Sequence, residues 1–117
     1  FGVPYANDDG LDAAAAVAAA LDIQQCVRHQ NAERRAAHPV ELRVGIGVHT
    51  GELTAGHLGA APHRVEYTVI GDTVNTASRL EALTKALGAG VLIGGATRDA
   101  MRAAGDNAFV VREVERV

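Results

Sequence analysis

The chain has 117 residues, 48% of them hydrophobic, and a formal charge of −3, which fits one globular domain. Its longest apolar run is short and rich in alanine, which argues against a membrane-spanning segment. With 14 acidic residues, 11 basic ones and Lys85 as the single lysine, the chain lacks the clustered positive charge that nucleic-acid binding needs.

The first third of the chain predicts a strand end followed by a long helix. Residues 1–3 form the strand end, because Pro4 cannot continue a ladder. The helix runs from Asn7 to about Glu33, begins with acidic capping residues, and buries a stripe made of Leu11, Ala14, Ala18 and Leu21. Cys26 lies within this pattern and is expected to be a buried thiol. As the single cysteine it excludes an internal disulfide and favours a reducing compartment.

A strand follows over residues 40–48, with alternate apolar residues on one face. Gly45 and Gly47 leave the other face bare, so that a ligand or another backbone can approach closely. They do not form a phosphate-binding loop, because the next element is a second strand, over 53–58, and not a helix. The two strands are predicted to pair as a hairpin around the turn at 49–51.

The second half of the chain alternates strands and helices. It predicts a strand over 65–70, a helix over 73–87 stopped by glycines, a strand over 91–93, a helix capped by Thr97 through Ala104, and a final strand over 109–117. This irregular order favours an α+β fold in which helices cover one face of a largely antiparallel sheet.

Two polar residues of the helix over 73–87 are candidates for a binding site. Asn75 and Arg79 are one helical turn apart, so an amide and a guanidinium project side by side. The core stripe of that helix is separate and consists of Leu80, Leu83 and Leu87. The alternative is a solvated arginine near Glu66 or Glu81. Surface roles rather than metal binding are expected for His49, His57 and His63, which lack a tight ligand spacing.

Three ordered segments carry a resemblance to a known family. They are residues Phe1–Pro4, Val44–Gly51 and Glu66–Leu80. In order and spacing they resemble the catalytic domain of class III nucleotidyl cyclases, in particular bacterial adenylate cyclases. The resemblance implies a ferredoxin-like α+β cyclase homology domain with a mostly antiparallel sheet. It also implies a lyase that converts ATP, or less often GTP, to the 3′,5′-cyclic nucleotide and pyrophosphate at sites shared between two protomers.

The resemblance assigns roles to five residues of this chain. Asn75 matches the asparagine of the family that orients the ribose, and Arg79 matches the arginine that stabilises the transition state on the phosphates. Thr68 stands where the family recognises the base, and Val69 and Ile70 would border the adenine. Many members have aspartate at the position of Thr68. A threonine there accompanies the bacterial subtype that makes cyclic AMP, so ATP is the favoured substrate.

The resemblance also implies components beyond these residues. The family binds two Mg²⁺ or Mn²⁺ ions per site through aspartates that precede the position of Phe1, so no metal ligand is assigned here. Residues 1–117 are then expected to be the later two thirds of a cytoplasmic catalytic domain, inactive alone and active as a head-to-tail homodimer in intracellular signal transduction. The parent protein could be membrane-anchored.

Two other classes of protein remain open. One is a degenerate cyclase-like module that binds nucleotide, dimerises or regulates a partner. The other is a generic α+β ligand-binding domain, which requires that Asn75 and Arg79 face away from any cleft.

Overall fold

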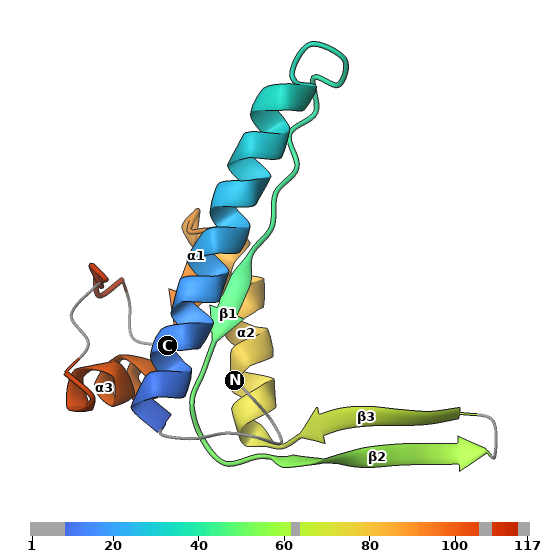
Figure 1. Ribbon diagram of the computed structural model, residues 1–117, viewed down its shortest axis with the longest axis vertical. Helices are drawn as coiled ribbons and strands as arrows, with labels where there is room; N and C mark the ends of the chain where they lie inside the picture. The colour runs from blue at the N-terminus through green and yellow to red at the C-terminus, as the bar shows by residue number, and fades with distance from the viewer. Residues whose placement is uncertain (1–8, 62–63, 106–108, 115–117) are drawn as a thin grey trace.

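The structure, a computed structural model, describes residues 9–61, 64–105 and 109–114 (Figure 1). The expected strand end at 1–3 and the caps Asn7 and Asp8 lie outside the described residues. In chain order the elements are α1 (Asp9–Arg34), β1 (Ile46–Val48), β2 (Thr54–Ala61), β3 (Arg64–Ile70), α2 (Asp72–Leu87), β4 (Val91–Ile93) and α3 (Gly95–Ala103). Both long helices are therefore confirmed within two residues of their predicted ends.

The strands form two separate pairs, which corrects the prediction of a largely antiparallel sheet. β1 lies parallel to β4, with Ile46 opposite Val91, and β2 lies antiparallel to β3, with Thr54 opposite Ile70. The fold is α+β, but the predicted hairpin between residues 40–48 and 53–58 is wrong. Residues 49–53 lead the chain away from β1, so β2 pairs with the strand that follows it and projects from the helices (Figure 1).

The strand predicted over residues 40–48 is shorter, because side chains of α1 take the place of a neighbouring strand. The Asn31 side chain donates to the carbonyl of Leu42 at 2.9 Å and accepts from its N–H at 2.8 Å. Gln24 Nε2 donates to the carbonyls of Val44 at 2.5 Å and Gly90 at 2.9 Å. These amides satisfy backbone groups that a ladder would otherwise pair, so regular strand structure begins only at Ile46.

The core lies between the first half of α1 and α3. Its buried members are Ala13, Val17 and Met101, with partly buried Ala14, Val48, Ile93, Ala100 and Phe109 packed against them. The buried stripe of α1 is thus rotated from the predicted one, and Leu21 is 42% exposed. Cys26 is exposed as well, which corrects the prediction of a buried thiol. The small alanines on the buried stripe leave room for α3 to pack against α1.

The last third of the chain departs from prediction at two points. Thr97 does not cap α3, because the helix begins earlier with Gly94 as its N-cap residue, and the Thr97 side chain is fully buried within the first turn. Residues 110–114 have no regular structure, so the predicted final strand is absent over that segment, while residues 115–117 lie outside the described part.

Candidate active site

Helix α2 lies directly on the bare face of β1. A Cβ at Gly47 would fall 2.5 Å from the backbone nitrogen of Glu81 and 2.9 Å from the Cβ of Leu80, and one at Gly45 would overlap the Thr84 side chain. The glycines therefore admit a second backbone, which is one of the two roles predicted for them. Their absence of side chains fixes how closely α2 can approach the sheet.

The connection from β3 to α2 is a single glycine. Gly71 has φ = 140°, a backbone conformation that L side chains rarely adopt, and its carbonyl accepts from the Asn75 N–H at 3.1 Å. At the other end, Gly88 takes the left-handed conformation and its N–H bonds to the Thr84 carbonyl, as the predicted glycine stop requires. The helix that carries both candidate residues is thus bounded by two glycines.

Asn75 and Arg79 are both exposed on α2, on a different side from its leucines. Leu80, Leu83 and Leu87 are half-buried, whereas Ala82 and Ala86 are exposed on the flank that continues from Arg79. Arg79 forms no ion pair with any residue whose side chain the structure describes, and these residues include Glu81 but not Glu66. The pairing with Glu81 is therefore absent, while the predicted alternative with Glu66 lies outside the described side chains.

The three residues predicted to contact the base lie at the end of β3, next to this helix. Thr68 is opposite Gly56 in the β2–β3 register, Val69 is half-buried and Ile70 is 53% exposed. The backbone brings them to the start of α2, because only Gly71 separates Ile70 from the helix. Their roles remain predictions.

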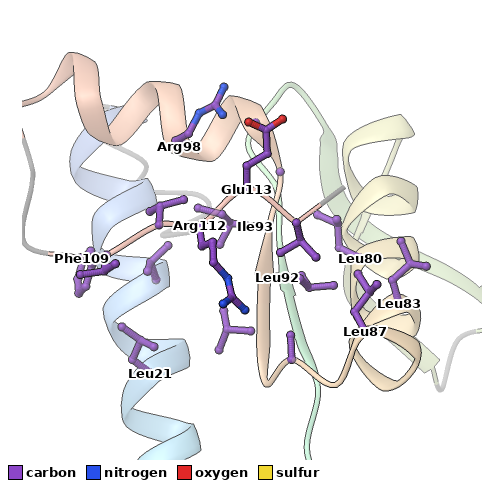
Figure 2. A pocket seen from close by; sticks show the side chains of 18 of the residues that line it. Leu21, Leu80, Leu83, Leu87, Leu92, Ile93, Arg98, Phe109, Arg112 and Glu113 are labelled. Atoms are coloured by element: carbon purple, nitrogen blue, oxygen red, sulfur yellow. The ribbon is translucent and has the colours of Figure 1, made fainter. Parts of the chain in front are cut away.

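A cavity of about 740 Å³ lies against the leucines of α2. Figure 2 shows Leu80, Leu83 and Leu87 on one wall, Leu21 and Phe109 on the opposite one, and Arg98, Arg112 and Glu113 beside them. Neither Asn75 nor Arg79 lines this cavity. The Asn75–Arg79 pair and this cavity are therefore different features of the molecule.

The metal ions that the family implies have no complete site among the described residues. No group of three or more His, Cys, Asp or Glu that could hold a metal ion occurs in this part of the chain. The described residues therefore do not fit the metal ions, and no catalytic step through them is derived. His49 is not a surface residue as predicted: it is half-buried against Gly94, and its buried Nδ1 has no hydrogen-bond partner among the described residues.

Sequence reasoning missed two threonines that form hydrogen bonds across the fold. Thr73 lies in the first turn of α2 and donates to the carbonyl of Glu52, and Thr50 is hydrogen-bonded to Thr97. The only local signal is the occurrence of threonine near helix starts, which suggests capping rather than contacts across the fold.

Comparison with known proteins identifies the family. Residues 2–117 match the adenylate and guanylate cyclase catalytic domain. Because this match covers nearly the whole chain, the chain belongs to the adenylate and guanylate cyclase catalytic domain family, as the resemblance predicted. No solved structure matches the chain.

Three relatives illustrate the similarity. Adenylate cyclase 1 of Rhizobium meliloti (strain 1021) is 43% identical over 77 residues, which are 66% of this chain and 11% of that protein. Adenylate cyclase of Anabaena cylindrica is 42% identical over 91 residues, 74% of this chain and 18% of that protein. An uncharacterized protein of Mycobacterium tuberculosis (strain ATCC 25618 / H37Rv) is 40% identical over 106 residues, 91% of this chain and 17% of that protein. The chain thus spans less than a fifth of the length of these relatives.

None of the helices in the described ranges is long and apolar enough to cross a membrane.

Proposed function

We propose that the intact protein is a nucleotidyl cyclase that converts ATP to 3′,5′-cyclic AMP and pyrophosphate. The observation that carries the proposal is the placement of Asn75 and Arg79, exposed one turn apart on a helix whose packing uses neither of them. Membership of the cyclase catalytic domain family and the names of two relatives, both adenylate cyclases, support it.

The proposed chemistry is an intramolecular phosphoryl transfer. The 3′-oxygen of the ribose loses its proton to water and forms a bond to the α-phosphorus, while the bond from that phosphorus to the bridging oxygen breaks and its electron pair leaves with pyrophosphate. The Asn75 amide can donate to and accept from ribose hydroxyls, and so hold the 3′-oxygen in line with the phosphorus. The Arg79 guanidinium offers several N–H donors to the phosphoryl oxygens on which negative charge increases.

ATP is proposed over GTP on two grounds. A threonine hydroxyl at position 68 can accept a hydrogen bond from the exocyclic amino group of adenine, which guanine lacks at that ring position. Val69 and Ile70 follow it on β3 and would supply apolar contact to the purine. The strand leads directly into α2, so base recognition and ribose orientation would use adjacent elements.

The exposure of Asn75 and Arg79 also supports a site completed by a second protomer. Neither residue lines the cavity described above, and the described residues contain no group of three or more His, Cys, Asp or Glu that could hold a metal ion. We therefore propose a head-to-tail homodimer, in which metal-binding groups come from residues other than those described here. The competing hypothesis is a degenerate module that binds nucleotide or regulates a partner without turnover.

The first prediction uses a substitution of Arg79 to distinguish an active cyclase from the degenerate module. In the intact protein, Arg79→Ala should lower the turnover number for ATP about 100-fold or more and change KM much less, because the guanidinium acts on charge formed in the transition state. Lys85→Ala is the matched control, since it removes one exposed cation from the same helix.

Product analysis with ATP and GTP measures both rate and base preference. Turnover of Arg79→Ala equal to that of the unaltered protein contradicts the role given to Arg79. Absence of cyclic nucleotide from the unaltered protein with Mg²⁺ or Mn²⁺ supplied supports the degenerate module, and faster turnover of GTP than of ATP contradicts the base assignment.

A further inference from the structure

The loop between β1 and β2 contacts the first turns of two helices. We name residues 49–52 the latch loop. On one side, the Thr50 hydroxyl lies 2.9 Å from the hydroxyl of Thr97, which is fully buried in the first turn of α3. The Val48 carbonyl accepts from the Gly94 N–H at 2.8 Å, so the backbone just before the loop is also joined to the start of α3. One side of the latch loop is therefore anchored in the body of the protein.

On its other side, the latch loop contacts the first turn of α2. The Thr73 hydroxyl donates to the carbonyl of Glu52 at 2.5 Å. A Cβ at Gly51 would lie only 2.6 Å from the Thr73 Oγ1, so the loop backbone lies against this side chain with no room for a larger residue. The hydrogen bond and the close contact fix Thr73 relative to the loop.

The contact adds a directional restraint to the packing of α2 on β1. Where α2 crosses β1, the strand presents Gly45 and Gly47, against which the Thr84 side chain and the backbone of Glu81 lie closely. This steric contact limits how near the helix can come to the strand. A hydrogen bond is directional, and that of Thr73 holds the first turn of α2, which these glycine contacts further along the helix do not reach.

Thr73 lies two residues before Asn75, in the same first turn. That turn is held on one side by β3 through Gly71 and on the other by the latch loop through Thr73. A shift of the turn therefore moves the Asn75 amide, and with it Arg79 one turn later. For reactions that depend on alignment, a displacement of about 1 Å costs on the order of 100-fold in rate.

We propose that Thr73 is a positioning residue for the cyclase reaction, and that the latch loop, anchored by Thr50, sets the position of Asn75 and Arg79 relative to the sheet. This inference rests on the proposed function. Thr73 acts through the helix and contacts neither the ribose nor the phosphates.

The test measures turnover and KM for ATP in variants of the intact protein. Thr73→Val removes the hydroxyl at nearly constant size and should lower turnover about tenfold or more, with KM changed less than about twofold. Thr73→Ser retains the donor and should restore turnover to within about twofold of the unaltered protein. Thermal unfolding is recorded for each variant, so that rates are compared well below the melting temperature.

Thr84→Val is the matched control. The Thr84 hydroxyl is buried on the same helix and donates to the Glu81 carbonyl at 2.5 Å, but this bond lies within the helix and far from the latch loop. Its loss should lower the melting temperature without a change in turnover beyond about twofold. A turnover loss in Thr84→Val as large as in Thr73→Val would show a general effect of weakening α2 and would overturn the positioning role.

Two further variants distinguish failure of the positioning role from failure of the proposed function. If Thr73→Val does not fold, Thr50→Val interrupts the other side of the latch loop and should also lower turnover at little change in KM. Arg79→Ala is measured in parallel. Loss of activity in Arg79→Ala together with full activity in the folded latch variants overturns the positioning role alone. Full activity in Arg79→Ala contradicts the role given to Arg79, and the positioning role with it. Absence of cyclic nucleotide from the unaltered protein overturns the proposed function.

Discussion

The two sides of α2 obey different constraints. The side that faces β1 is set by sterics: Leu80, Glu81 and Thr84 lie so close to Gly45 and Gly47 that even a methyl group would displace them. The opposite flank carries Asn75 and Arg79, both exposed, and alanines beyond them. One side thus determines where the helix lies, and the other carries polar groups that the fold does not require.

This difference separates residues needed for folding from residues available for chemistry. A large polar side chain that is exposed and has no ion pair with the described side chains contributes little to the free energy of unfolding. Its presence one turn from a second such group is therefore better explained by a ligand than by stability. Substitutions on the two sides should have opposite consequences, which makes the comparison testable.

The largest effect is expected on the packed side. Gly47→Ala places a Cβ 2.5 Å from the Glu81 backbone nitrogen, so α2 must move away from β1. We expect a loss of about 3 kcal/mol in the free energy of unfolding, as for overpacked cores, measured by urea denaturation. Gly56→Ala is the control, because a Cβ there has nothing within 4 Å. An equal loss in the two variants would contradict the close approach of α2.

Next in size is Asn75→Ala on the exposed flank. Turnover of ATP should fall about 30-fold, or about 2 kcal/mol, because the ribose is no longer held for attack by its 3′-oxygen. The free energy of unfolding should change by less than about 0.5 kcal/mol. A stability loss that accounts for the lost activity would place Asn75 among the residues of the fold.

A smaller effect on stability is expected from the α1 side chain that hydrogen-bonds to backbone carbonyls where a neighbouring strand would otherwise pair. Gln24→Ala removes two hydrogen bonds, to the carbonyls of Val44 and Gly90, and should lower the free energy of unfolding by about 1–2 kcal/mol. Gln25→Ala, at the next position of the same helix, is the control, since Gln25 is exposed. Equal denaturation curves for the two variants would show that the Gln24 amide does not hold the 40–45 segment in place.

Local patterns predicted the elements but not their partners. Leucine spacing and flanking glycines predicted the helix over 73–87. The same pattern predicted correctly that Asn75 and Arg79 lie apart from the core stripe. The pairing of β1 with β4 could not be predicted in the same way, because it joins strands separated by a hairpin and a helix. Residues 40–45 look like a strand by alternation, yet amides of Gln24 and Asn31 occupy their backbone groups. The hydrophobic periodicity of the sequence does not indicate such contacts between a side chain and a distant backbone.

The candidate site shows the same division. The resemblance supplied the candidate residues, whose roles remain predictions, and helix geometry alone predicted that two of them lie side by side. Thr50 and Thr73 escaped prediction, since each depends on a loop meeting a helix that is distant in sequence. Side-chain hydrogen bonds of this kind depend on the tertiary fold. They cannot be predicted from the composition of the chain or from the spacing of its residues.

The most direct test measures the free energy of unfolding and ATP turnover on the same preparations of Gly47→Ala and Arg79→Ala. For Arg79→Ala we expect a free energy of unfolding within about 0.5 kcal/mol of that of the unaltered protein and turnover lowered about 100-fold or more. For Gly47→Ala we expect a loss of about 3 kcal/mol in the free energy of unfolding. An Arg79→Ala protein that loses stability as Gly47→Ala does, or that keeps full turnover, would contradict the assignment of the exposed flank to catalysis.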